Sequence, residues 1–183
     1  EINMKDMNLV VIPYKEENNY LFYFISYKNK NDSKKFFLSY YKYDLINKMN
    51  IMIETKQIES IKASFWSKSY DLFGFSCILM RNNETNEDII SCFYGAGFPA
   101  EIQAKIFSIN NSLIKEKHNY KYLIGNYKIV DFNIITAIPS FEKEKAIVYY
   151  TKNNILSKIN FNVKNIQDEF KKTKEVIEAE YKK

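Results

Sequence analysis

The residue types that usually carry catalysis are thinly spread along this chain of 183 residues. His118 is the only histidine, so a serine–histidine–aspartate triad would have to use it. It lies in the polar stretch 115–119, where a surface-loop histidine is the ordinary interpretation. The chain has no Walker loop, no dinucleotide-binding glycine pattern and no carboxylate pair whose spacing indicates acid–base chemistry. The sequence therefore predicts that there are no catalytic residues and that the protein is not an enzyme.

Cys77 and Cys92 are the only cysteines, and with one histidine they are too few for a structural zinc site. We therefore expect no metal and no cofactor. The two cysteines flank residues 82–86, a turn-rich segment between two strand-like runs. If the hairpin turns at residues 84–85, Cys77 lies directly opposite Cys92, and a modest shift brings the sulfurs into bonding range. Two interpretations remain open, a cross-strand disulfide in an oxidising compartment or two buried free thiols in a reducing one.

The composition favours strands and sets limits on the partners. The chain has 15 Tyr and 14 Phe but only 4 Gly, and flat aromatic side chains suit a pleated, half-buried surface. Its net charge of +5 is modest, and lysines are interspersed with glutamates, which favours a solvated surface over nucleic-acid binding. There is no run of about 18 apolar residues that would span a membrane.

The start of the chain bears on the compartment. The chain opens with Glu1 rather than Met, which fits removal of a signal peptide or a longer N-terminus. Three Asn-X-Ser/Thr sequons, at Asn31, Asn83 and Asn110, fit a secreted protein. We therefore expect a secreted or luminal location, either extracellular or vacuolar.

The hydrophobic pattern predicts many short strands followed by one helix. Before residue 59 the strand-like runs are 9–12, 20–27, 36–43 and 49–54. Beyond it they are 61–66, 72–80, 88–94, 100–109, 120–130, 132–138, 145–151 and 154–159. Regular spacing of this kind is typical of a closed barrel or a sandwich. Ile166, Phe170, Ile177 and Tyr181 then share one helical face, which predicts a terminal amphipathic helix.

From about residue 60 onwards, the order of elements resembles the lipocalin family, in its apolipoprotein D and bacterial branch. Ser64-Phe-Trp66 stands where lipocalins have Gly-X-Trp, and Ile155-Leu-Ser-Lys158 resembles their Ile-Leu-Ser-Arg on the eighth strand. The resemblance implies an all-β fold, an eight-stranded antiparallel up-and-down barrel over residues 59–183 with the C-terminal helix packed outside. A β-rich N-terminal extension, residues 1–58, would pack on the barrel or continue it. Trp66 and Lys158 would close the narrow end through a cation–π contact.

Such a barrel implies non-enzymatic binding, transport or sequestration of a small hydrophobic, lipid-like ligand. Alternate strand positions give the candidate ligand-binding residues, which are Phe75, Tyr94, Ile106, Tyr122, Ile134 and Tyr149. The competing hypothesis is a β-sandwich or propeller-type module whose exposed Tyr/Phe/Lys surface binds a protein partner. Self-association as a homo-oligomer is open under both hypotheses.

Overall fold

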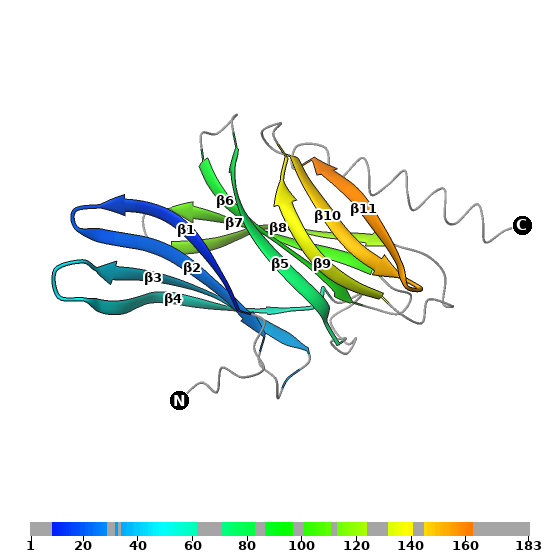
Figure 1. The fold of residues 1–183 in the computed structure, drawn as a ribbon, viewed down its shortest axis with the longest axis horizontal. Helices are drawn as coiled ribbons and strands as arrows, with labels where there is room; N and C mark the ends of the chain where they lie inside the picture. Colours follow the sequence, from blue (N-terminus) through cyan, green and yellow to red (C-terminus); the bar gives the residue numbers. More distant parts are fainter. Residues whose placement is uncertain are drawn as a thin grey trace, which may run out of the picture.

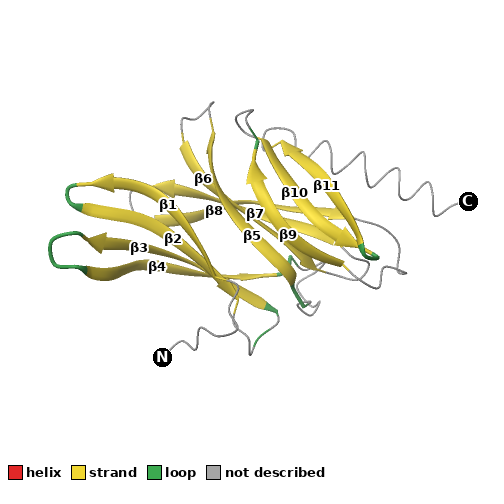
Figure 2. Ribbon diagram, in the orientation of Figure 1, coloured by secondary structure: helices red, strands yellow, loops and turns green. Residues whose placement is uncertain are grey.

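The computed structural model describes residues 9–28, 32, 34–61, 71–82, 87–96, 101–110, 113–123, 132–140 and 145–162. Within these ranges every regular element is a strand (Figure 2), which confirms the predicted all-β class. The first four strands are β1 (Leu9–Glu17), β2 (Tyr20–Lys28), β3 (Lys35–Asp44) and β4 (Met49–Glu59). The next four are β5 (Phe73–Asn82), β6 (Glu87–Ala96), β7 (Glu101–Asn110) and β8 (Leu113–Leu123). The last three are β9 (Phe132–Pro139), β10 (Lys145–Lys152) and β11 (Ile155–Asn162).

The strands form three antiparallel sheets, with the orders β1-β2-β3-β4, β5-β6-β7-β8 and β11-β10-β9. We call these the first, middle and last sheets. Figure 1 shows the middle sheet, in green, between the blue-to-cyan first sheet and the yellow-to-orange last sheet. The described part of the molecule is therefore a stack of three sheets rather than a single-walled barrel.

Tight turns made by asparagine pairs join two of the hairpins. Asn18 and Asn19 both have positive φ angles, 52° and 65°, between β1 and β2. Asn153 and Asn154 do the same between β10 and β11, at 50° and 62°. Two consecutive positive φ values match the right-handed twist of the flanking strands, and asparagine tolerates that region better than most residues. The abundant asparagine of the sequence thus sets the register of these hairpins.

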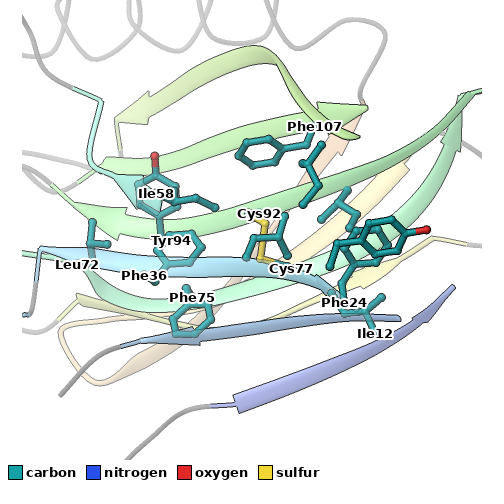
Figure 3. Packing of buried hydrophobic residues seen from close by; sticks show 14 of the residues in the cluster. Ile12, Phe24, Phe36, Ile58, Leu72, Phe75, Cys77, Cys92, Tyr94 and Phe107 are labelled. Atoms are coloured by element: carbon teal, nitrogen blue, oxygen red, sulfur yellow. A yellow bond between two sulfur atoms is a disulfide. The ribbon is translucent and has the colours of Figure 1, made fainter. Parts of the chain in front are cut away.

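The first sheet packs on one face of the middle sheet through a cluster of buried apolar side chains (Figure 3). The ring of Phe36 stacks on Phe75 at 4.7 Å and meets Tyr94 edge-on at 5.3 Å, centroid to centroid. Burying a side chain of this size contributes roughly 1.5–3 kcal/mol. The disulfide between Cys77 and Cys92 lies in the same cluster. It confirms the predicted pairing of these two cysteines across the β5–β6 hairpin, where they are directly opposed.

A second cluster joins the opposite face of the middle sheet to the last sheet. It includes Phe93, Ile102 and Ile106 from the middle sheet and Ile134, Val148 and Phe161 from the last sheet. Strand β6 alternates between the clusters, and every residue from Ile89 to Ala96 is buried. A strand covered on both faces needs apolar or small side chains at odd and even positions alike, and β6 has them.

The predicted closed eight-stranded barrel is not formed by the described residues. In an up-and-down barrel, strands that follow one another in the chain are neighbours. Here β8 and β9 belong to different sheets, and β9 instead lies beside β5, where the backbone N–H of Ala137 donates to Ser76 Oγ at 2.9 Å. The predicted strand 61–66 and the predicted C-terminal helix lie outside the described residues, apart from Ile61. The polar stretch 110–119, expected as a connection, instead belongs mostly to β8, which pairs with β7 from Leu113 onward.

Candidate functional site: the outer aromatic face of the first sheet

The structure distributes the predicted ligand-binding residues over separate layers. Phe75 and Tyr94 lie in the cluster between the first and middle sheets. Ile106 and Ile134 lie in the cluster between the middle and last sheets. The middle sheet therefore separates these two pairs, and they do not face a common cavity.

The remaining predicted residues are placed as follows. Tyr149 is opposite Lys158 in the β10–β11 register, and both alternate with the buried Val148, so they lie on the outer surface of the last sheet. Tyr122 pairs with Ile102 in the backbone register, and its side chain lies outside what the structure describes. Trp66 also lies outside the described residues, so its predicted contact with Lys158 stays a prediction.

The described residues contain no group of three or more histidine, cysteine or acidic side chains that could hold a metal ion. The backbone of His118 lies in β8, opposite Ile106, and its side chain is outside the described set. The candidate site is instead a surface, the outer side of the first sheet.

The register of the first sheet settles which of its side chains face outward. Phe24 and Tyr40 are opposed in the β2–β3 ladder and buried against the middle sheet. Because side chains alternate along a strand, the pairs one position to either side of Phe24–Tyr40, which are Tyr23–Tyr41 and Ile25–Ser39, point away from the core. We call this surface the outer aromatic face. Its central part comprises Val11, Pro13, Leu21, Tyr23, Ile25, Tyr27, Phe37, Ser39, Tyr41, Tyr43, Asn50, Met52, Thr55 and Gln57, and Glu16, Lys35 and Glu59 lie at its ends.

Two cross-strand aromatic pairs dominate this face. The rings of Tyr23 and Tyr41 stack at 5.6 Å with 11° between their planes. The rings of Tyr27 and Phe37 stack at 5.3 Å with 22° between their planes. Such pairs contribute about 0.5–1.5 kcal/mol each beyond the area they bury, and they hold the rings in fixed orientations. The face is therefore preorganised rather than a set of independent mobile side chains.

Between the two aromatic pairs lies a lower row of small polar side chains. The hydroxyl of Ser39, which is fully buried, lies 2.9 Å from that of Thr55. Thr55 Oγ1 also lies 3.2 Å from the sulfur of Met52. Because these groups satisfy one another, the row does not need water, and the face can lose its hydration at little cost.

The charge distribution sets this face apart from an ordinary solvated sheet surface. Its central rows, from the Tyr27–Phe37 pair to the Tyr23–Tyr41 pair, contain no ionisable side chain other than tyrosine. At one end Lys35 and Glu59 are 4.0 Å apart and offset each other. Burial raises the pKa of the Tyr23 hydroxyl above its usual value, and the neighbouring Tyr41 raises it further. The central rows of the face are therefore uncharged at neutral pH. Its ends carry charge, because Asp32 lies 3.4 Å from Lys35 and Glu16 is opposite Leu21.

Apolar exposure completes the description of the face. Val11 is 51% exposed, Met52 59% and Leu21 38%. The water-facing side of an antiparallel sheet normally carries polar residues, and this side carries mostly aromatic and aliphatic ones. The sequence pattern could have indicated this apolar outer side, because residues 20–27 and 36–43 are apolar or aromatic at nearly every position rather than at alternate ones. That pattern predicts strands covered on both sides.

Comparison with protein-family models, curated proteins and solved structures found no match to this chain. The resemblance to lipocalins accordingly gains no support from relatives and stays a prediction. No helix in the described ranges is long and apolar enough to cross a membrane. The disulfide fits an oxidising compartment.

Proposed function

We propose that this chain is a non-enzymatic interaction module that binds a protein partner through the outer aromatic face. The observation that carries the proposal is the pair of stacked aromatic ridges, Tyr23–Tyr41 and Tyr27–Phe37, whose half-buried rings lie in the uncharged central rows of the outer aromatic face. Protein interfaces are enriched in tyrosine, phenylalanine and methionine and depleted of charge at their centre. The residues of this face match that composition.

A rigid face of this kind lowers the entropy cost of binding a partner. Rings already stacked lose little rotational freedom when a partner arrives, so the entropy cost of ordering is small. The inner side of the same sheet is rigid too, since Phe24 stacks on Tyr40 at 4.5 Å beneath it. We expect hot-spot behaviour at Tyr23, Tyr27 and Tyr41, each costing about 2 kcal/mol or more of binding free energy when truncated.

The proposal includes the compartment. The disulfide supports a secreted or luminal protein, extracellular or vacuolar, which meets its partner outside the reducing cytosol.

Carriage of a small hydrophobic ligand remains the second hypothesis from the sequence. The spaces between the sheets, however, are occupied by the two buried clusters. Native mass spectrometry with organic extraction separates the two hypotheses. A stoichiometric apolar molecule bound to the chain would favour the carrier, and its absence alongside a face-specific partner would favour the module.

Site-specific photocrosslinking tests the proposal directly. A photoreactive phenylalanine analogue replaces Tyr27 on the outer aromatic face, or Ile155, a 67% exposed residue of the last sheet, as the matched control. In the fluid or lysate where the protein occurs, we expect a discrete protein adduct from position 27 and none from position 155. The Tyr23→Lys substitution should abolish the adduct. Equal labelling from both positions, or no protein adduct from position 27, would overturn the proposal.

A further inference from the structure

We infer that the outer aromatic face binds a second copy of this chain, forming a two-fold symmetric dimer in which two first sheets pack face to face. The inference rests on the proposed function, because it names the partner for the same surface. It is carried by three properties of the face, which are its relief, its size and its charge.

The relief consists of parallel rows that cross the strands. The Tyr27–Phe37 pair forms one ridge and the Tyr23–Tyr41 pair forms the next. Between them runs the lower row of Ile25, Ser39 and Thr55, which are opposed in the β2–β3 and β3–β4 ladders. Ser39 is fully buried beneath its neighbours, Ile25 is half-buried and Thr55 is exposed, so the row is a shallow step between the ridges. The ridge of a second copy would cover this step.

A two-fold axis supplies such a ridge from the same chain. Let the axis lie in the interface, parallel to the rows and midway between the lower row and the Tyr23–Tyr41 ridge. Rotation then places the Tyr41 ridge of each copy over the Ser39 row of the other, and both contacts form at once. This reciprocity is the property of an isologous interface, in which one surface complements itself. Aligned packing of two sheets about 10 Å apart accommodates it.

The size of the face is sufficient for a specific dimer. Four strands spaced about 4.8 Å apart, each about nine residues long at about 3.3 Å per residue, cover about 570 Å². Two copies would therefore bury about 1,100 Å² of footprint, before the relief of the side chains is counted. Specific interfaces begin at about 1,000–1,200 Å² in total, so the face meets that requirement.

Charge also favours a second copy. Two chains that each carry a net charge of +5 repel unless their contact surfaces are neutral. The central rows of the outer aromatic face carry no Lys, Arg, Asp or Glu, and the charges lie at its ends, where Lys35 is 3.4 Å from Asp32 and 4.0 Å from Glu59 and where Glu16 is opposite Leu21. Identical copies can therefore meet there without placing like charges opposite each other, which would otherwise cost binding free energy.

The test measures the oligomeric state by sedimentation equilibrium on the intact, disulfide-bonded chain. We expect the wild type to be dimeric, and Tyr41→Lys and Tyr41→Glu each to raise the dissociation constant at least about thirtyfold. In the proposed dimer the two copies of position 41 lie on either side of the axis, about 12 Å apart at Cα. A mixture of the two variants should therefore recover dimers, because each pair then contains one lysine and one glutamate. Ile155→Lys on the last sheet should leave the dimer unchanged.

Folding is checked separately by circular dichroism and by the melting temperature, which the substitutions at position 41 should lower by only the few degrees that loss of the Tyr23–Tyr41 stack costs. A wild type that stays monomeric up to about 100 μM, well above the micromolar constants of weak specific interfaces, would overturn the inference. So would a dimer insensitive to Tyr41→Lys, or variants that do not recover when mixed. If the position 27 crosslink then forms to a different protein, the proposed function stands while this inference fails. If neither a dimer nor a crosslink forms, both fail.

Discussion

Gly95 in β6 sits where the middle sheet meets the last sheet, and its missing side chain makes room for a ring. A Cβ added there would collide with the ring of Phe132 in β9. We expect Gly95→Ala to lower the free energy of unfolding by about 1–3 kcal/mol, the usual cost of overpacking a core. Urea denaturation measures the change.

A double-mutant cycle identifies the cause of that loss. If the collision is responsible, Phe132→Leu should relieve part of the cost, so the two substitutions together should destabilise less than their sum. Strict additivity would instead assign the effect of Gly95→Ala to the strand backbone. The sequence did not indicate this contact, because the expected strand ended at residue 94, whereas β6 continues through Gly95 to Ala96.

Two buried tyrosines make stability sensitive to alkaline pH. Burial, reinforced by Glu17, raises the pKa of Tyr40 to about 12. Burial, reinforced by Glu116, raises the pKa of Tyr94 well above its usual value. A raised folded-state pKa means that the unfolded chain releases these protons first, so their stabilising contribution is intact below pH 10 and is lost as pH rises above it.

We therefore expect the free energy of unfolding to fall as pH rises from about 10 to 12. Tyr40→Phe should make that fall shallower, because phenylalanine has no proton to lose. Guanidinium titrations at several alkaline pH values measure both slopes. Tyr43→Phe, on the outer aromatic face, is the matched control and should leave the slope closer to that of the wild type. Identical slopes for the wild type and Tyr40→Phe would contradict the assignment to Tyr40.

At the scale of elements, the β5–β6 hairpin depends on its disulfide. Cys77 and Cys92 lie 15 residues apart in sequence and are opposed at 4.1 Å between Cα atoms. Closing a loop of that length restricts the unfolded chain and stabilises the fold by about 3 kcal/mol. The variant with both cysteines replaced by alanine should lose at least that much in urea denaturation. In the folded wild type, reductant alone should act slowly, because the two cysteines are at most 3% exposed.

The turn between β3 and β4 is held by one carboxylate. Asp44 accepts hydrogen bonds from the backbone N–H groups of Ile46 and Asn47, each at 2.9 Å, and from the Asn47 amide. The two hydrogen bonds from Asn47, first the backbone one and then the side-chain one, contribute most to holding the pKa of Asp44 below its usual value. Leu45 N–H also donates to the carbonyl of Asn19, which ties this turn to the β1–β2 turn.

A lowered folded-state pKa has the opposite consequence from the tyrosines. Asp44 stabilises the fold above its unfolded pKa, and this contribution is lost as pH falls through the folded pKa. We expect Asp44→Ala to speed amide hydrogen exchange at Ile46 and Asn47 and to reduce the loss of stability in acid. Asp32→Ala, in the β2–β3 connection, is the control and should leave exchange in the β3–β4 turn unchanged. Unaltered exchange at both amides would contradict the role of Asp44.

Local pattern predicted the elements better than their arrangement. The predicted runs 72–80, 88–94 and 145–151 lie within β5, β6 and β10 or extend one residue beyond them, and the cysteine pairing followed from hairpin symmetry. What the pattern could not determine is which strands are neighbours across a crossover, such as β5 and β9. The alternation of side chains also could not predict which face of the middle sheet each residue is on. Both faces of this sheet are buried, so apolar residues occupy odd and even positions alike, as in β6. The pattern therefore could not show that Phe75 and Ile106 face opposite layers.

For the whole molecule, the decisive fact is that the middle sheet is covered on both faces. Hydrogen exchange should therefore be slowest in β6, whose residues from Ile89 to Ala96 are all buried. Among the strands that the structure describes, β1 and β11 each pair with a neighbour on one side only, and they should exchange faster. Uniform protection across the three sheets would indicate that the stack unfolds without an ordered sequence of openings.

The same layering places the first sheet over one face of the middle sheet, and truncation tests whether residues 59–183 fold without it. A fragment of residues 59–183 would expose the inner face of the middle sheet, including Phe75, Tyr94 and Phe107. A contiguous apolar surface of that kind promotes aggregation, so we expect the fragment to aggregate or to bind hydrophobic dyes strongly. Supplying residues 1–58 as a separate chain should restore solubility, because the first sheet can then cover that face again. A soluble, monomeric fragment with cooperative unfolding would instead show that residues 59–183 fold independently of the first sheet.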